Sequence, residues 1–159
     1  MRYKRFVIAF IVLMLLAFLS GCGQRQDEPP TAESIYEEAI ALLQEGKYAD
    51  ASEKFTGLGH YFDASLYAVY CNALTSAEGG NYSLAASSMK ALDGFMDSSI
   101  LNGYYTGRAF EEEEMYEEAL AQYSLILQYG DAGTRAAAMP GKALERDYKA
   151  ACALEQAGS

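Results

Sequence analysis

Apolar, small and acidic residues recur along most of this chain with a period of 34 residues. The repeating positions begin after Thr31, and three successive units keep the step without a slip. A fixed period of roughly 20–50 residues is typical of repeat proteins, whose units bury their apolar faces by stacking on their neighbours. The positions that share the period are Tyr36, Tyr70 and Tyr104; Tyr48, Tyr82 and Tyr116; Ala51, Ala85 and Ala119; Phe55, Met89 and Tyr123; and Asp63, Asp97 and Asp131.

Within each unit the apolar pattern stops once and starts again, which predicts two helices. In the first unit, apolar residues recur at helical spacing from Ile35 to Leu43, Gly46 interrupts them, and the pattern resumes at Tyr48. Glycine favours the end of a helix because it adopts the left-handed conformation without a steric penalty. Gly80 holds the same place in the second unit, whereas the third unit has Glu114 there, so its turn lacks this signal.

An aspartate stands where the first helix of each following unit should begin. We expect Asp63, Asp97 and Asp131 to be N-caps, whose carboxylates accept hydrogen bonds from the free backbone N–H groups of the next helix. The small residues Ala51, Ala85 and Ala119 should let the two helices of a unit approach closely. The large residue four positions later should fill the space beyond.

This arrangement resembles the tetratricopeptide repeat. The matching positions are Ala51 followed by Phe55 four residues later, and the small residues Ala39, Ala73 and Gly107 where the family has glycine. The chain departs from the family in three ways. Ile35 and Val69 replace the family's tryptophan, Gly103 has lost it, and aspartate replaces the closing proline. The resemblance covers residues 32 to about 131, and it implies an all-α fold, an α-solenoid of about three helix-turn-helix repeats.

The C-terminal tail is less regular. Residues 131–139 begin like a fourth unit, and Pro140 should stop or kink that helix because proline lacks a backbone donor. A last amphipathic helix is expected to follow and to cap the stack, because terminal repeats need a polar outer face. Its apolar face carries Leu144, Tyr148 and Cys152, and its other face carries Lys142, Arg146 and Lys149.

The first 22 residues have the pattern of an export signal. Arg2, Lys4 and Arg5 precede the apolar run Phe6 to Leu19, and small residues follow. The run is shorter than the ~20 residues that a membrane-spanning helix needs, although an uncleaved anchor and an ordinary secretion signal are alternatives. The closing motif consists of Leu19, Ser20, Gly21 and Cys22.

That motif resembles the lipobox of bacterial lipoproteins. The resemblance implies that a diacylglyceryl group is attached to the Cys22 thiol and that cleavage makes Cys22 the first residue. Two acyl chains give stable membrane attachment where one is marginal. We therefore expect a signal peptide over residues 1–21, the lipidated Cys22 with a flexible tether over 22–30, and a helical repeat domain over 31–159. The expected location is the outer, extracytoplasmic face of a bacterial cell membrane.

Composition argues against several classes of function. The formal net charge of −10 disfavours nucleic acid as a partner, because phosphate binding needs clustered Lys and Arg. We expect no metal or cofactor and no catalytic set. The only histidine, His60, lies beside glycine at a helix end, and Glu111 to Glu114 should form a solvated acidic face rather than a cation site. Cys71 and Cys152 are expected to be two buried free thiols, with a disulfide as the alternative.

The tyrosines of the first helices are the best candidates for partner binding. By resemblance, the first helix of each unit lines the inner face of the superhelix, and aromatic residues and arginine are favoured binding anchors. The alternative is that these tyrosines only pack between helices, with their hydroxyls reaching solvent. The candidate groove consists of Tyr36, Ile40, Tyr67, Tyr70, Leu74, Leu101, Tyr104 and Arg108.

These features favour a non-catalytic interaction module that holds a protein or peptide partner at the membrane surface. An accessory subunit of an envelope assembly or secretion complex is the first alternative. A homo-oligomeric structural module and a surface enzyme are further alternatives, and the lack of a credible catalytic set disfavours the enzyme.

The anchor hypothesis predicts that Cys22→Ser abolishes lipid attachment, because the acyl acceptor is the thiol. Metabolic labelling of a bacterial host with a fatty acid, followed by recovery of the protein, measures this directly. Equal label in the variant and the wild type would contradict the anchor.

Overall fold

The structure, a computed structural model, describes residues 29–158 of the chain. The chain divides into two units, Met1–Pro30 and Thr31–Ser159. We call the second of these the helical unit. The predicted signal peptide, Cys22 and most of the tether therefore lie outside the described residues. No helix within residues 29–158 combines the length and the apolar character needed to cross a membrane.

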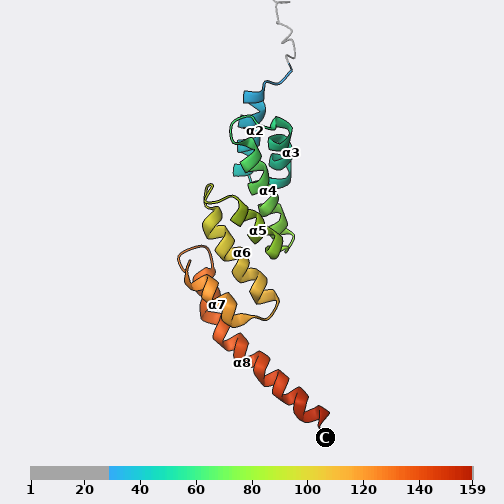
Figure 1. The fold of residues 1–159 in the computed structure, drawn as a ribbon, viewed down its shortest axis with the longest axis vertical. Coiled ribbons are helices and arrows are strands. Elements are labelled where there is room, and N and C mark those ends of the chain that lie inside the picture. The colour runs from blue at the N-terminus through green and yellow to red at the C-terminus, as the bar shows by residue number, and fades with distance from the viewer. Residues whose placement is uncertain (1–28, 159) are drawn as a thin grey trace, which may run out of the picture. The chain divides into compact units, whose positions relative to one another are not determined.

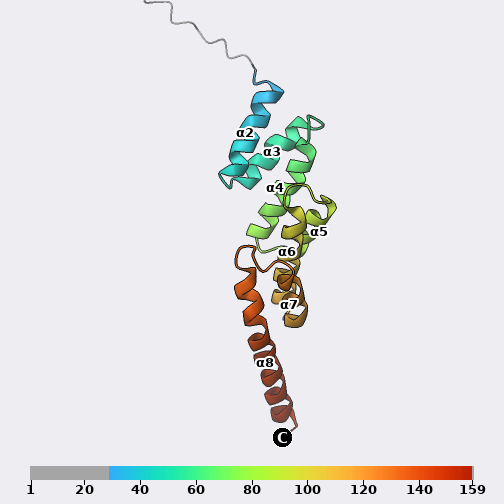
Figure 2. The ribbon, with the colours of Figure 1, turned by 90° about the vertical axis from the view of Figure 1, so that its left-hand side faces the viewer.

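Residues 29–158 form seven helices and no strand (Figure 1). Each helix packs mainly on the helix before it and the helix after it, from α2 to α8. The predicted all-α stack of three helix pairs followed by a C-terminal helix is confirmed (Figure 2). The pairs are α2 with α3, α4 with α5 and α6 with α7. The helices are α2 (Ala32–Gln44), α3 (Tyr48–Leu58), α4 (Ala64–Glu78), α5 (Tyr82–Ala91), α6 (Ser98–Glu112), α7 (Tyr116–Ser124) and α8 (Ala132–Ala157).

The turn inside each pair has the same geometry in all three units. Gly46, Gly80 and Glu114 have φ angles of 77°, 79° and 57°. In each turn, the N–H of the next residue donates to the carbonyl oxygen five residues earlier, at 2.8–2.9 Å. The third turn therefore forms although Glu114 lacks the freedom of glycine, because the packing of α6 against α7 holds the residue in a conformation that its side chain disfavours.

The helices of each pair meet through one small and one large residue. Ala39, Ala73 and Gly107 on the first helices are buried, as are Phe55, Met89 and Tyr123 on the second. In the third unit the pair is Gly107 and Tyr123, and a Cβ atom added to Gly107 would lie 2.6 Å from the tyrosine ring. The smallest residue thus stands opposite the tyrosine, since the ring occupies the space where a methyl group would otherwise lie.

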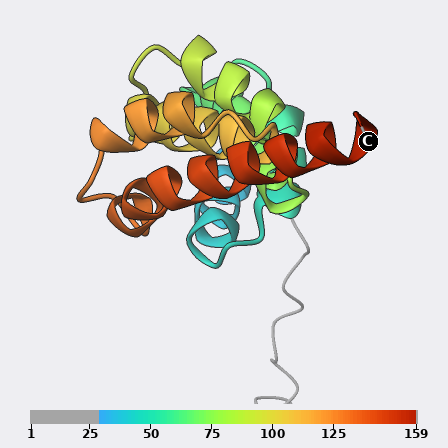
Figure 3. The same ribbon diagram turned by 90° about the horizontal axis from the view of Figure 1, so that it is seen from below.

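Helix α8 differs from the predicted tail in two respects. Pro140, which is predicted to stop or kink the helix, lies inside a helix that continues to Ala157, so it does not stop it. Lys142 and Arg146 of α8, not Leu144 and Tyr148, contact the preceding helices. Arg146 forms an ion pair with Glu117, whereas Leu144 and Tyr148 are 74% and 70% exposed. Figures 1 and 3 show the C-terminal half of α8 extending past the other helices.

The predicted solvated acidic face is wrong for Glu111. Its carboxylate is nearly buried and forms ion pairs with Arg135 and Lys142 of α8, and it accepts a hydrogen bond from the Tyr123 hydroxyl. Burial by itself would raise the pKa of Glu111, but these hydrogen bonds outweigh burial, and the pKa lies below its usual range. Glu111 therefore attaches α8 to the third unit, while Glu113 and Glu114 are exposed.

Two glycines of α6 test the packing between α6 and α7. Gly107→Ala should lower the free energy of unfolding by about 1–3 kcal/mol, because its methyl group would overlap the Tyr123 ring. Gly103→Ala is the matched control. The Cβ atom there would lie 3.9 Å from Ile126, and alanine should stabilise the helix by up to about 1 kcal/mol. Chemical denaturation followed by circular dichroism distinguishes the two, and equal shifts would contradict the described contact.

Candidate functional site

Three tyrosine–aspartate hydrogen bonds connect successive units. The hydroxyl groups of Tyr36, Tyr70 and Tyr104 donate to a carboxylate oxygen of the aspartate 27 residues later, at 2.5, 2.6 and 2.6 Å. The acceptors are Asp63, Asp97 and Asp131. Each bond joins the first helix of one unit to the residue that precedes the first helix of the next. We call these three hydrogen bonds the tyrosine–aspartate links.

The links correct the predicted role of the aspartates. Asp63, Asp97 and Asp131 stand at the N-cap positions of α4, α6 and α8, but none of their side chains bonds to a backbone N–H of the helix. The carboxylates face the preceding unit instead. Burial, followed by the hydrogen bond to Asp97, raises the pKa of Tyr70 well above its ordinary value. The hydroxyl is thus a neutral donor at physiological pH.

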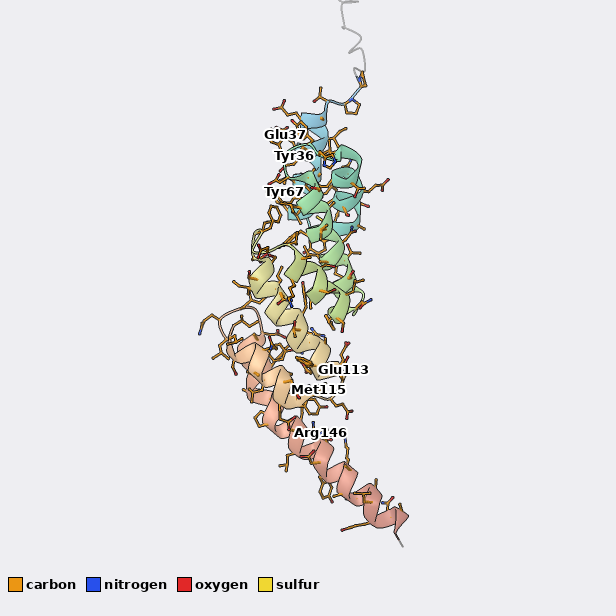
Figure 4. The ribbon with its side chains drawn as sticks, viewed as in Figure 1. Tyr36, Glu37, Tyr67, Glu113, Met115 and Arg146 are labelled. Atoms are coloured by element: carbon orange, nitrogen blue, oxygen red, sulfur yellow. The ribbon has the colours of Figure 1, made fainter. Side chains whose placement is uncertain are left out.

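The predicted groove residues fall into three groups. The first group packs against the core of the first unit and consists of Tyr36, Ile40 and Tyr67. The centroid of the Tyr36 ring lies 5.6 Å from that of Phe55 and 6.0 Å from that of Tyr67. Figure 4 labels Tyr36 and Tyr67, which lie close together on neighbouring first helices.

Two further predicted groove residues, Tyr70 and Leu101, belong to the core between the second unit and α6, and they are 6% and 3% exposed. The remaining three, Leu74, Tyr104 and Arg108, line one hollow. The structure therefore does not bring the whole predicted groove together.

This hollow is built by four successive helices, and we call it the tyrosine hollow. It has a volume of about 250 Å³. Helix α3 contributes one residue, α4 contributes three, α5 contributes one and α6 contributes three. The lining residues are Tyr48, Leu74, Ala77, Glu78, Tyr82, Tyr104, Tyr105 and Arg108.

The guanidinium of Arg108 is held in place against Tyr82. Its central carbon lies 4.1 Å from the centroid of the Tyr82 ring, and one of its nitrogens donates to the Tyr82 hydroxyl at 2.5 Å. The ring of Tyr105 stacks on Tyr82, with the centroids 6.3 Å apart and 21° between the planes. A cation over an aromatic face is stabilised by the ring quadrupole, so the arginine side chain is ordered before any ligand arrives.

Two other hollows are larger but chemically less suited to recognition. One, of about 510 Å³, lies between α2 and α3, and its only cation, Lys54, forms an ion pair with Glu38 at 2.8 Å. The other, of about 320 Å³, is lined by Ile100 and residues 125–129 and contains no charged side chain. Of these three hollows, only the tyrosine hollow combines aromatic walls with a cation that has no carboxylate partner among the described residues.

Sequence reasoning missed Tyr48, Tyr82 and Tyr105 as site residues. Tyr48 and Tyr82 follow the 34-residue period, and each begins the second helix of its unit. The period and the turn together could have assigned the first residue of each second helix to the hollow. The turn reverses the chain, so this residue lies beside the end of the first helix. Tyr105 had no such signal, since neither Cys71 nor Met139 at the equivalent positions is aromatic.

The remaining reactive side chains form no cluster in the part of the chain that the structure describes. No group of three His, Cys, Asp or Glu side chains within residues 29–158 is arranged to hold a metal ion, and His60 is exposed. Cys71 and Cys152 are free thiols, as predicted, but only Cys71 is buried, so the predicted burial of Cys152 is wrong. Burial raises the pKa of the Cys71 thiol to about 11. A thiol with that pKa is a poor nucleophile at neutral pH because it is almost entirely protonated.

Comparisons of the chain with protein-family models, with curated proteins and with solved structures found no match.

The tyrosine–aspartate links predict a specific loss of stability. Tyr70→Phe should lower the free energy of unfolding by about 1.5–3 kcal/mol, because it leaves Asp97 without its donor. Tyr61→Phe is the matched control. The Tyr61 ring packs against Tyr36, but no hydrogen bond of its hydroxyl is described, so the change should stay within about 0.5 kcal/mol. Urea denaturation of both variants gives the comparison, and an undiminished stability of Tyr70→Phe would contradict the role of the link.

Proposed function

We propose that this protein is a non-catalytic interaction module that holds a protein or peptide partner, and that the tyrosine hollow is where the partner binds. The observation that carries the proposal is an aromatic hollow with one ordered guanidinium, lined by helices from all three units. Tyrosine and arginine are enriched among the residues that dominate binding energy at protein interfaces. A rigid stack of helices positions such groups with little loss of entropy on binding.

The proposal places this module on the outer face of a bacterial cell membrane. Support comes from the sequence, in which Leu19, Ser20 and Gly21 precede Cys22 at the end of an apolar run. A polar segment, residues 23–30, separates Cys22 from the first helix and would act as a tether. The lipid would keep the module at the surface, while the helical unit would remain available to its partner.

The acidity of the chain supports a partner that is not nucleic acid. The formal net charge is −10, and most lysines and arginines of the helical unit already form ion pairs with carboxylates. A phosphate backbone needs several free cations on one face. The tyrosine hollow offers one guanidinium among aromatic rings, which suits a protein segment with a mixture of apolar and polar side chains.

Position-specific photo-crosslinking in intact bacteria tests the proposed function. A photoreactive amino acid replaces Glu78, an exposed residue that lines the hollow, and in a second strain it replaces Glu118, an exposed glutamate of α7 outside the hollow. We expect a discrete protein adduct from position 78 and none from position 118. Adducts of equal yield at both positions, or none at position 78, would contradict a binding site in the hollow.

A further inference from the structure

Arg108 is one of two cations of the helical unit that have no carboxylate partner among the described residues, and the other, Lys90, is exposed. The chain carries 22 acidic residues against 12 lysines and arginines, so an arginine that meets no carboxylate is unexpected. No carboxylate oxygen of the described residues lies within the 4.0 Å of an ion pair from Arg108. Six other cations are each paired with a carboxylate, and they are Lys47, Lys54, Arg135, Lys142, Arg146 and Lys149.

The position of Arg108 makes this lack of a partner meaningful. Lys90 also has no described ion pair, but it is exposed at the end of α5, where water solvates it. Arg108 is only partly exposed, and it is held over the Tyr82 ring by a hydrogen bond to the Tyr82 hydroxyl. One hydroxyl satisfies a small part of the five N–H donors that a guanidinium carries. The remaining donors are available to an anionic group.

The walls of the hollow restrict what can carry that anion. Leu74, Ala77 and the rings of Tyr48 and Tyr104 favour apolar and aromatic side chains beside the charge. Stacked sugars are disfavoured at Tyr82, because Arg108 and Tyr105 already pack on its ring. A phosphate backbone is disfavoured by Glu78, which lines the same hollow. A single carboxylate flanked by apolar side chains fits both the charge and the walls.

We propose that Arg108 selects the partner by binding the side-chain carboxylate of an aspartate or glutamate that lies next to an aromatic or aliphatic residue in a peptide segment. This inference rests on the proposed function and specifies the class of segment that the hollow accepts. An arginine–carboxylate contact is directional and charge-assisted, so it contributes specificity as well as affinity. The net acidity of the chain would slow the approach of acidic partners, and the ordered guanidinium offsets this locally.

Selection from a library of random dodecapeptides displayed on phage tests the proposal. The peptides are fused through their C-termini to the coat protein, so they present only side-chain carboxylates. We expect the wild-type helical protein to enrich peptides in which an acidic residue adjoins an aromatic or aliphatic residue. The best enriched peptide, synthesised with both ends blocked, should lose at least tenfold in affinity, or about 1.4 kcal/mol, when its acidic residue becomes the amide.

Two variants complete the test. Arg108→Gln should abolish the preference for the acidic residue, so that the peptide and its amide counterpart bind with the same affinity. Lys90→Gln, which removes one positive charge outside the hollow, should keep the tenfold preference. Circular dichroism verifies that both variants remain helical. If Arg108→Gln unfolds, Arg108→Lys takes its place. Lysine keeps the positive charge but lacks the planar guanidinium that binds a carboxylate with two N–H groups, so the preference for the acidic peptide over its amide should be smaller.

Several outcomes would overturn the inference. They are enrichment of peptides without acidic residues, failure to enrich any peptide, and an acidic preference that persists in Arg108→Gln. Binding of chitotetraose that is lost in Tyr82→Ala would assign the hollow to glycans instead. A specific crosslink from position 78 in cells together with any of these results would leave the proposed function in place and remove only the carboxylate preference. Absence of that crosslink would count against the proposed function itself.

Discussion

The stack depends on the hydrogen bond between a tyrosine hydroxyl and an aspartate carboxylate, which is formed at each of the two junctions between units and again where the third unit meets α8. Helices packed only through apolar faces can slide and rotate, because hydrophobic attraction has little direction. A bond of about 2.6 Å between a hydroxyl and a carboxylate, partly buried at the first two junctions, has a defined length and angle. It therefore fixes where the first helix of the next unit begins.

These links also account for an unusual backbone conformation. The residue before each linking aspartate has a positive φ angle, 45° at Phe62, 52° at Met96 and 49° at Gly130. Such a conformation is strained for a bulky side chain and persists where the surroundings over-determine it. The hydrogen-bonded aspartate and the helix that begins directly after it keep the preceding residue in this conformation. Phe62 and Met96, with 78% and 54% of their surface exposed, face solvent as a consequence.

The tyrosine hollow follows from the same arrangement. The links set the spacing of the first helices. The turns inside each unit, with their positive φ angles, reverse the chain so that Tyr48 and Tyr82, at the start of the second helices, face α4 and α6. One residue, Tyr104, takes part in both features, since its hydroxyl reaches Asp131 while its ring lines the hollow. Packing within the stack and the shape of the proposed binding site are therefore coupled through this ring.

The sequence by itself determined the helices, the pairing and the number of units, because periodicity records which side chains must face a neighbour. Gly46 and Gly80 marked the turns, and the 34-residue step of Ala51, Ala85 and Ala119 marked the close contacts. Only the tertiary structure decided what each polar group bonds. Asp97 has the local signature of an N-cap, yet its partner is Tyr70, 27 residues away. Glu111 belongs to an acidic run, yet it is the ion-pair partner of α8. Local sequence specifies backbone conformation through short-range sterics, whereas the choice of a hydrogen-bond or ion-pair partner depends on which distant groups packing brings within a few ångströms.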